Sequence, residues 1–135
     1  HLSLRRQRQM CIRDRIKAAA PNARVQMVGY PSISKDGNIC PLHVVDDKLI
    51  PAPPIHVPMV TDFENIAQDM QRGLAERTGT EFIDMKPSTE FNGMCGADES
   101  REFAGVIDTT GPAFNLPFHA NSRGHAHIAD VIANS

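Results

Sequence analysis

The sequence predicts an α/β fold with a short parallel sheet, because one pattern occurs in it twice. A helical segment, a tight turn and a short strand follow one another in residues 16–30 and again in residues 61–85. Long irregular connections follow both strands, in residues 32–60 and 86–117. Helices that alternate with strands are typical of parallel sheets covered by helices, and ligands bind beyond the carboxyl ends of such strands.

The composition is that of an ordinary globular protein with one domain. Of the 135 residues, 41% are hydrophobic and 22% are charged, and the net charge is −2. These values show no bias towards nucleic acid or membrane surfaces. No apolar run approaches the roughly 20 residues that span a bilayer, and the first residues have no signal-peptide pattern.

The first 15 residues, HLSLRRQRQMCIRDR, do not match the sequence that follows. They are rich in arginine, and the string RQMCIRDR is similar to translated sequencing-adapter readthrough. We therefore expect residues 1–15 to be a non-native segment and residues 16–135 to form the domain. The alternatives are a native basic helix and an arm that binds nucleic acid. The arm is the weaker alternative, because arginines without an aromatic residue are a weak signal for nucleic-acid binding. The arginines of such an arm would be Arg5, Arg6, Arg8, Arg13 and Arg15.

The first helix–strand unit is defined by its breaks. Residues 16–20 are predicted to end a helix, because a Pro-Asn pair follows them. Residues 23–30, ARVQMVGY, are nearly all apolar in their inner part, as in a buried parallel strand, and a proline ends them. The long connection after this strand has a Lys-Asp-Gly turn at Gly37, and a short strand or helical turn is predicted at residues 42–50.

The second unit begins with the clearest helix in the sequence. Thr61 and Glu64 have the Thr-x-x-Glu spacing of a capping box. Gly79 is placed to end the helix, and residues 81–85, EFIDM, predict a short strand. Apolar residues repeat at helical spacing and form one face, at Phe63, Ile66, Ala67, Met70 and Leu74.

The end of the chain is predicted to be irregular up to Pro117, with a short element at residues 103–107. Ser122 is the expected N-cap of a last helix. Asp84 is expected to cap a loop, whereas Asp108 and Asp130 are expected to face solvent. The methionines predicted to fill the core are Met27, Met70 and Met85.

Three cysteines are present, so at most one intrachain disulfide can form. Cys40 and Cys95 lie in loops that contain glycine or proline, whereas Cys11 lies in the arginine-rich start. A Cys40–Cys95 disulfide would join the two long loops of an exported protein. Two free thiols are the alternative, because the sequence does not supply the geometry.

His119 is the candidate for chemistry. It lies in the segment LPFHANSRGHAHIAD, in a loop directly before the last helix. A neutral imidazole on a loop can accept a proton from a Ser or Cys nucleophile and return it to the leaving group. A metal site is not expected, since His125 and His127 are two residues apart on a helix and point to different faces. No other ligand completes a zinc spacing.

Three segments, taken in order, resemble the C-terminal half of an SGNH (GDSL-type) hydrolase, close to the secreted actinobacterial esterase and lipase branch. They are APNARVQMVGYP, the capped helix with GTEFIDM, and FHANSRGHAHIADVI, which is similar to the family's His-Pro-Asn-x-x-Gly-His block. The resemblance covers residues 16–135 and implies the C-terminal part of a three-layer α/β/α sandwich. For the intact protein it implies a secreted serine esterase or lipase without a cofactor, and we expect a monomer.

Position in that block assigns the residue roles. The catalytic histidine corresponds to His119, and the other fixed positions correspond to Asn121, Gly124 and His125. Ala120 replaces the usual proline. Leu116 stands where many members have an aspartate, and its side chain cannot orient an imidazole. The resemblance therefore implies that the Leu116 backbone carbonyl orients His119, which gives a Ser-His dyad.

The Gly-Asp-Ser nucleophile and the oxyanion motifs of the family do not occur in this chain. The segment GADES, residues 96–100, is no substitute, because it lies late in the chain and has no strand-to-helix context. A histidine without a nucleophile and an oxyanion hole performs no acyl transfer. We therefore expect the C-terminal fragment of a serine ester hydrolase, inactive alone, whose parent acts on a small-molecule or lipid ester.

Two other functions remain open. The chain could be a small non-enzymatic α/β domain that binds a ligand or partner through its two long loops. It could also bind nucleic acid through its basic arm, a function that disappears if residues 1–15 are non-native. The discriminating observation is whether the native gene begins near Ile16 or far upstream.

Overall fold

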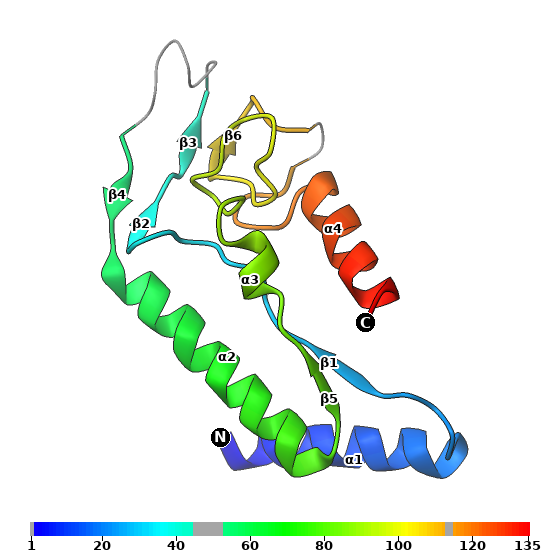
Figure 1. Ribbon diagram of the computed structural model, residues 1–135. Helices are drawn as coiled ribbons and strands as arrows, with labels where there is room; N and C mark the ends of the chain where they lie inside the picture. Colours follow the sequence, from blue (N-terminus) through cyan, green and yellow to red (C-terminus); the bar gives the residue numbers. More distant parts are fainter. Residues whose placement is uncertain (1, 45–52, 113–114) are drawn as a thin grey trace.

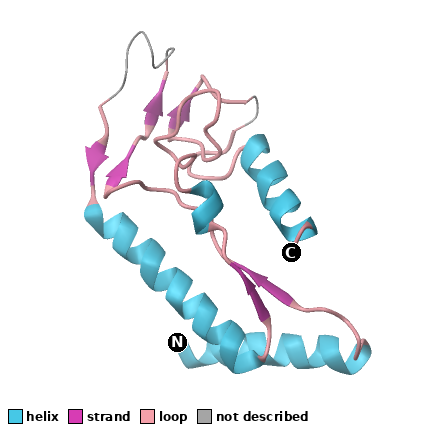
Figure 2. Ribbon diagram, viewed as in Figure 1, coloured by secondary structure: helices cyan, strands magenta, loops and turns pink. Residues whose placement is uncertain are grey.

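The structure is a computed structural model that describes residues 2–44, 53–112 and 115–135 (Figure 1). It is a mixed α/β fold with an elongated shape (Figure 2). Its helices are α1 (Leu2–Ala19), α2 (Pro58–Thr78), α3 (Lys86–Thr89) and α4 (Ser122–Ala133). Its strands are short: β1 (Gln26–Val28), β2 (Asn38–Ile39), β3 (Leu42–His43), β4 (Ile55–His56), β5 (Glu81–Ile83) and β6 (Ile107–Asp108).

The predicted parallel pairing is confirmed for β1 and β5. Gln26 lies opposite Glu81 and Val28 lies opposite Ile83 in a parallel register. The helix α2 precedes β5 in the chain and packs against the pair, so β1, α2 and β5 form a strand–helix–strand unit. Both strands are shorter than predicted, because each forms a ladder only where its partner lies alongside.

The start of α2 differs from the prediction. The helix begins at Pro58, a residue suited to the first helical turn, so Thr61 and Glu64 lie inside it and do not form a capping box. The Thr61 hydroxyl instead lies 2.6 Å from the Ser34 hydroxyl. The Glu64 carboxylate accepts hydrogen bonds from the backbone N–H groups of Ser34 at 2.9 Å and Ile33 at 3.3 Å. These side chains therefore fasten α2 to the loop after β1.

The end of α2 is as predicted, because Gly79 adopts a left-handed conformation with φ +59°. The apolar face of the helix is only partly covered. Leu74 is buried, but Phe63, Ile66 and Met70 are 60%, 55% and 44% exposed. Met70 therefore does not fill the core, because the two-stranded β1–β5 pair covers only the C-terminal half of α2.

The helix α1 crosses the end of the β1–β5 pair (Figure 1). It ends at Ala19, within one residue of the predicted end, and it continues through residues 15 and 16 without a break. Ile12 and Ile16 line an apolar cavity of about 240 Å³ together with Val25 and Leu74. The side chains of Arg5, Arg6 and Arg8 lie outside the described part of the structure.

The opposite end of the molecule is rich in loops and holds two small sheets. β2 pairs with β4 antiparallel, and β3 pairs with β6 parallel. The Lys-Asp-Gly turn leads into β2, with φ +51° at Asp36 and +76° at Gly37, the conformation that an Asp-Gly hairpin turn requires. Of the predicted element at residues 42–50, Leu42–His43 forms β3, and residues 45–50 lie outside the described residues.

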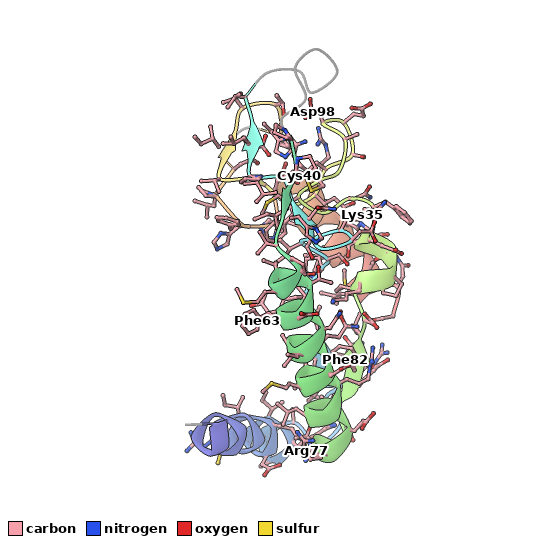
Figure 3. The ribbon with its side chains drawn as sticks, turned by 90° about the vertical axis from the view of Figure 1, so that its left-hand side faces the viewer. Lys35, Cys40, Phe63, Arg77, Phe82 and Asp98 are labelled. Atoms are coloured by element: carbon pink, nitrogen blue, oxygen red, sulfur yellow. A yellow bond between two sulfur atoms is a disulfide. The ribbon has the colours of Figure 1, made fainter. Side chains whose placement is uncertain are left out.

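A disulfide between Cys40 and Cys95 joins the two long connections, which confirms the predicted pairing (Figure 3). Cys11 is an exposed free thiol. The disulfide joins residues 55 positions apart. A covalent link over that separation restricts the unfolded chain much more than it restricts the folded one.

Replacing both Cys40 and Cys95 with alanine is expected to lower the free energy of unfolding by about 4 kcal/mol, the loop-closure contribution for a separation of 55 residues. The measurement is urea unfolding monitored by circular dichroism. The matched control is Cys11→Ala, which removes an exposed thiol and is expected to leave the unfolding midpoint unchanged. A loss of less than about 1 kcal/mol in the double variant would contradict a stabilising role for the disulfide.

Candidate functional site

His119 lies on an exposed loop that is held in place by its backbone. The His119 carbonyl accepts a hydrogen bond from the Ala104 N–H at 2.9 Å, and Phe103 forms an isolated bridge with Ala120. Phe118, the residue before His119, has φ +57°, a conformation that non-glycine residues rarely adopt. The loop therefore has a defined backbone although its side chains face solvent.

The imidazole is oriented by a backbone carbonyl, but the carbonyl belongs to Pro117. His119 Nδ1 lies 2.8 Å from the Pro117 oxygen, while the Leu116 oxygen accepts a hydrogen bond from the His119 backbone N–H at 3.2 Å. The tight turn therefore uses the Leu116 carbonyl to bind the His119 backbone N–H. The Pro117 carbonyl is the one that contacts the imidazole ring. Because a carbonyl can only accept, Nδ1 carries the proton and Nε2 is the basic nitrogen.

The N-cap of α4 is Asn121, not the predicted Ser122. The Asn121 Oδ1 accepts a hydrogen bond from the Gly124 N–H at 3.0 Å. Its Nδ2 donates to the Arg101 carbonyl at 2.7 Å, and the side chain is only 2% exposed. A Cβ on Gly124 would lie 2.4 Å from the Glu102 carbonyl oxygen, so only glycine allows this close packing. Asn121 and Gly124 thus fix the direction in which the His119 loop enters α4.

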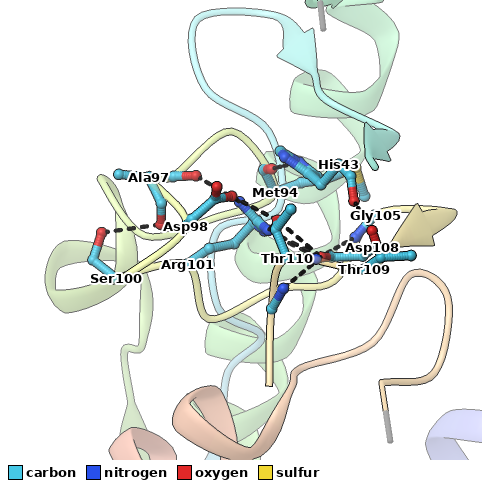
Figure 4. Close-up of polar contacts among 12 residues, drawn as sticks. His43, Met94, Ala97, Asp98, Ser100, Arg101, Gly105, Asp108, Thr109 and Thr110 are labelled. Carbon is cyan, nitrogen blue, oxygen red and sulfur yellow. Dashed lines mark hydrogen bonds and ion pairs between the residues drawn. The ribbon is translucent and has the colours of Figure 1, made fainter. Parts of the chain in front are cut away.

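A buried ionic cluster that no sequence pattern indicated lies in the loop-rich end of the molecule (Figure 4). Arg101 is fully buried. Its guanidinium donates to Asp98 at 2.8 Å, to both oxygens of Asp108 at 3.0 Å, and to the Thr110 hydroxyl at 2.7 Å. The Gly111 N–H also donates to Asp108, at 2.9 Å. The cluster therefore holds the chain segments of Asp98, Arg101 and Asp108 together.

Asp108 was expected to face solvent, but its side chain is only 2% exposed. It lies on the inner face of the β3–β6 pair with His43, whose Nε2 lies 2.9 Å from the Met94 carbonyl. Burial raises the pKa of Asp108, but hydrogen bonds and charge attraction from Arg101 outweigh it, so the pKa lies below its ordinary value. The outer face of the same pair carries Leu42 and Ile107, which are 43% and 51% exposed.

The other predicted residues take ordinary structural roles. Asp84 accepts hydrogen bonds from Gln68 and Arg72, and from the Lys86 N–H at 3.0 Å in the segment after β5. Asp130 is exposed, and His125 is exposed at the start of α4. His127 Nδ1 lies 2.8 Å from Glu102, a contact that the sequence did not indicate.

The described part of the chain holds neither a nucleophile for His119 nor a metal site. Within residues 2–44, 53–112 and 115–135, no hydrogen bond joins a serine or cysteine to the His119 ring, and no group of three or more His, Cys, Asp and Glu residues could hold a metal ion. No helix in this part of the structure is long and apolar enough to cross a membrane. The geometry therefore provides a proton acceptor and its orienting carbonyl.

A separate polar cavity of about 510 Å³ lies beyond the carboxyl ends of β1 and β5. Ser32 and Ser34 contribute to its wall from the loop after β1, and Asp84 and Lys86 contribute from the segment after β5. Glu64 contributes from α2. The sequence indicated this region, because ligands bind beyond the carboxyl ends of parallel strands. It could not identify the lining residues, because they come from three separate segments of the chain.

Comparison with models of known protein families finds no match to this chain, and comparison with curated proteins finds none either.

Proposed function

We propose that this chain is the histidine-bearing, C-terminal part of a secreted serine ester hydrolase of the SGNH type, with the domain formed by residues 16–135 and a non-native segment at residues 1–15. The nucleophilic serine lies outside this chain, and the chain is inactive alone. In the intact enzyme the serine attacks the carbonyl carbon of a small-molecule or lipid ester. His119 takes the proton of the serine and delivers it to the departing alcohol, and water then releases the acyl group.

The observation that carries the proposal is the arrangement of the FHANSRGH segment. His119 Nδ1 is paired with the Pro117 carbonyl at 2.8 Å, so Nε2 has the lone pair that a general base needs. Nε2 has no partner among the described residues, and the side chain is exposed. A loop with a fixed backbone and a single oriented tautomer suits a proton shuttle.

The open surface of α2 also supports the proposal. Phe63, Ile66 and Met70 are exposed on one face of a long helix, and exposed apolar patches of this kind mark a surface that another layer of protein covers. The β1–β5 pair has two strands, fewer than an ordinary sheet. A three-layer sandwich with further strands and helices would cover these groups.

The Cys40–Cys95 disulfide supports an exported protein, because such bonds persist in oxidising compartments. It joins the segment between β2 and β3 to the loop that leads to Arg101 and His119. Function in an oxidising environment would keep this link intact.

The experiment that tests the proposal is long-read sequencing of the genomic locus across the codons of residues 1–15. We expect the reading frame upstream of Ile16 to encode a strand followed by Gly-Asp-Ser, and the RQMCIRDR codons to be absent. A frame that starts at or near these residues would refute the ester hydrolase, because no serine nucleophile would exist.

A non-enzymatic α/β binding domain is the second candidate, and the polar cavity beyond β1 and β5 favours it. That cavity is lined by Ser34, Glu64 and Lys86 and does not involve His119. The same locus experiment separates the two candidates, since the binding domain requires no Gly-Asp-Ser segment upstream.

A further inference from the structure

The polar cavity beyond β1 and β5 has a wall with a fixed shape. Ser34 is 7% exposed, and its hydroxyl lies 2.6 Å from that of Thr61. The side chain of Glu64 is 11% exposed and accepts hydrogen bonds from two backbone N–H groups. Lys86 Nζ donates to Asn65 Oδ1 at 2.7 Å and lies 4.0 Å from Glu64. The polar groups are therefore held in place by the protein before any ligand arrives.

The chemistry of the wall favours hydroxyl groups over anions. Lys86 is already paired with Asn65 and Glu64, and Lys35 lies 4.0 Å over the ring of Phe91. Asp84 is bound by Gln68 and by another side chain of α2. An anionic ligand would have to displace these contacts, and it would also face the carboxylates of Asp36 and Glu90 in the same wall. A hydroxyl both donates and accepts, so it can donate to these carboxylates and accept from the amide and hydroxyl donors of the wall.

The volume sets the size of the ligand. About 510 Å³ lies within the range of ordinary small-molecule sites. One or two sugar rings fit this space, whereas a polymer chain would have to extend out of it. The position at the carboxyl ends of two parallel strands is the usual location for such ligands.

An apolar cavity of about 240 Å³ adjoins the polar one. The two share Glu64, Gln68 and Lys86 in their walls. The apolar cavity is lined in addition by Tyr30, Pro31, Ile33 and Ala67. Tyr30 is 67% exposed, so the aromatic ring is open to a ligand at the cavity mouth.

We propose that the two adjoining cavities bind one glycoside, with its sugar in the polar cavity and its apolar aglycone in the apolar cavity. The shared wall of Glu64, Gln68 and Lys86 then lies beside the glycosidic linkage. The binding is independent of ester hydrolysis, because no lining residue belongs to the His119 loop.

The test is titration of the full chain with methyl β-glucoside, methyl β-galactoside and hexyl β-glucoside, followed by backbone amide NMR. We expect saturable shifts at residues 32–36, 61–68 and 84–90, and about tenfold tighter binding of hexyl than of methyl β-glucoside, because an apolar cavity favours buried methylenes. Phosphate, glutamate and choline are titrated in parallel.

Three variants on the exposed surface of α2 make the test specific. Asn65→Trp fills the rim of the polar cavity and is expected to weaken all glycosides about tenfold or more. Ala67→Phe fills the apolar cavity and is expected to remove the preference for the hexyl group alone. Glu76→Trp, on the same helix but outside both cavities, is the matched control and is expected to bind like the unmodified chain. Thermal unfolding checks that all three fold.

Defined results would overturn the proposal. The absence of saturable binding by all three glycosides would refute it, as would equal binding by Asn65→Trp and Glu76→Trp. Equal affinity for the methyl and hexyl glucosides would refute the position of the aglycone. Binding of phosphate, glutamate or choline at these residues in place of the glycosides would refute the ligand class. None of these results bears on the presence of Gly-Asp-Ser upstream. The glycoside proposal and the ester hydrolase proposal can therefore be refuted independently of each other.

Discussion

Replacing His119 with alanine, in the enzyme restored with its Gly-Asp-Ser segment, is expected to lower kcat/KM for p-nitrophenyl acetate by about 10⁴-fold. The reason is chemical. A serine hydroxyl is a weak nucleophile unless a base takes its proton, and Nε2 of His119 is the nitrogen that the Pro117 contact leaves basic. The residual rate reflects binding and oxyanion stabilisation.

The control for this variant is His56→Ala. His56 is an exposed histidine on β4 that contacts Asn38, and its loss is expected to leave kcat/KM unchanged. A His119→Ala enzyme with the kcat/KM of the parent would exclude His119 as the base.

The parts of the fold that the sequence predicted correctly depend on local chemistry. The helix stop at Gly79 follows from the left-handed conformation that glycine adopts readily. The pairing of β1 with β5 follows from the alternation of helix and strand. The helix stop depends on one residue, and the strand pairing depends on the order of helix and strand along the chain.

The capping predictions failed for a related reason. Thr61 and Glu64 have the spacing of a capping box, but Pro58 begins the helix one turn earlier. Ser122 is a good N-cap residue, yet its neighbour Asn121 reaches both Gly124 and the distant Arg101 carbonyl. A spacing rule cannot distinguish between two adjacent N-cap candidates when a contact with a distant part of the chain determines which of them caps the helix.

The site shows the same division between local and distant chemistry. The sequence indicated the His119 loop, but it assigned the orienting role to Leu116, because it could not anticipate that the turn uses that carbonyl for the His119 N–H. Asp108 was expected to face solvent, since a lone aspartate usually does. Its burial depends on Arg101, and no periodic pattern links these two residues.

Replacing Arg101 with methionine is expected to lower the free energy of unfolding by about 3–5 kcal/mol, the usual loss when one member of a buried ion pair is removed. Arg101 is fully buried and forms ion pairs with Asp98 and Asp108. Methionine has a similar length and removes the Arg101 charge from both carboxylates. Urea unfolding at neutral pH, with the disulfide intact, measures the loss. Arg77→Met, on the exposed surface of α2, is the control and is expected to cost less than about 1 kcal/mol.

A double variant and an acid titration separate this electrostatic effect from lost packing. Because the pKa of folded Asp108 lies below its ordinary value, its stabilising contribution is complete above about pH 4 and is lost as the pH falls through the lowered pKa. That part of the acid dependence is expected to disappear in Asp108→Asn. The Arg101→Met/Asp108→Asn variant is expected to be less destabilised than the sum of the two single variants, since it no longer contains an unpaired Asp108 carboxylate. Strictly additive losses, with an unchanged acid dependence, would show that Arg101 contributes packing and no charge pairing.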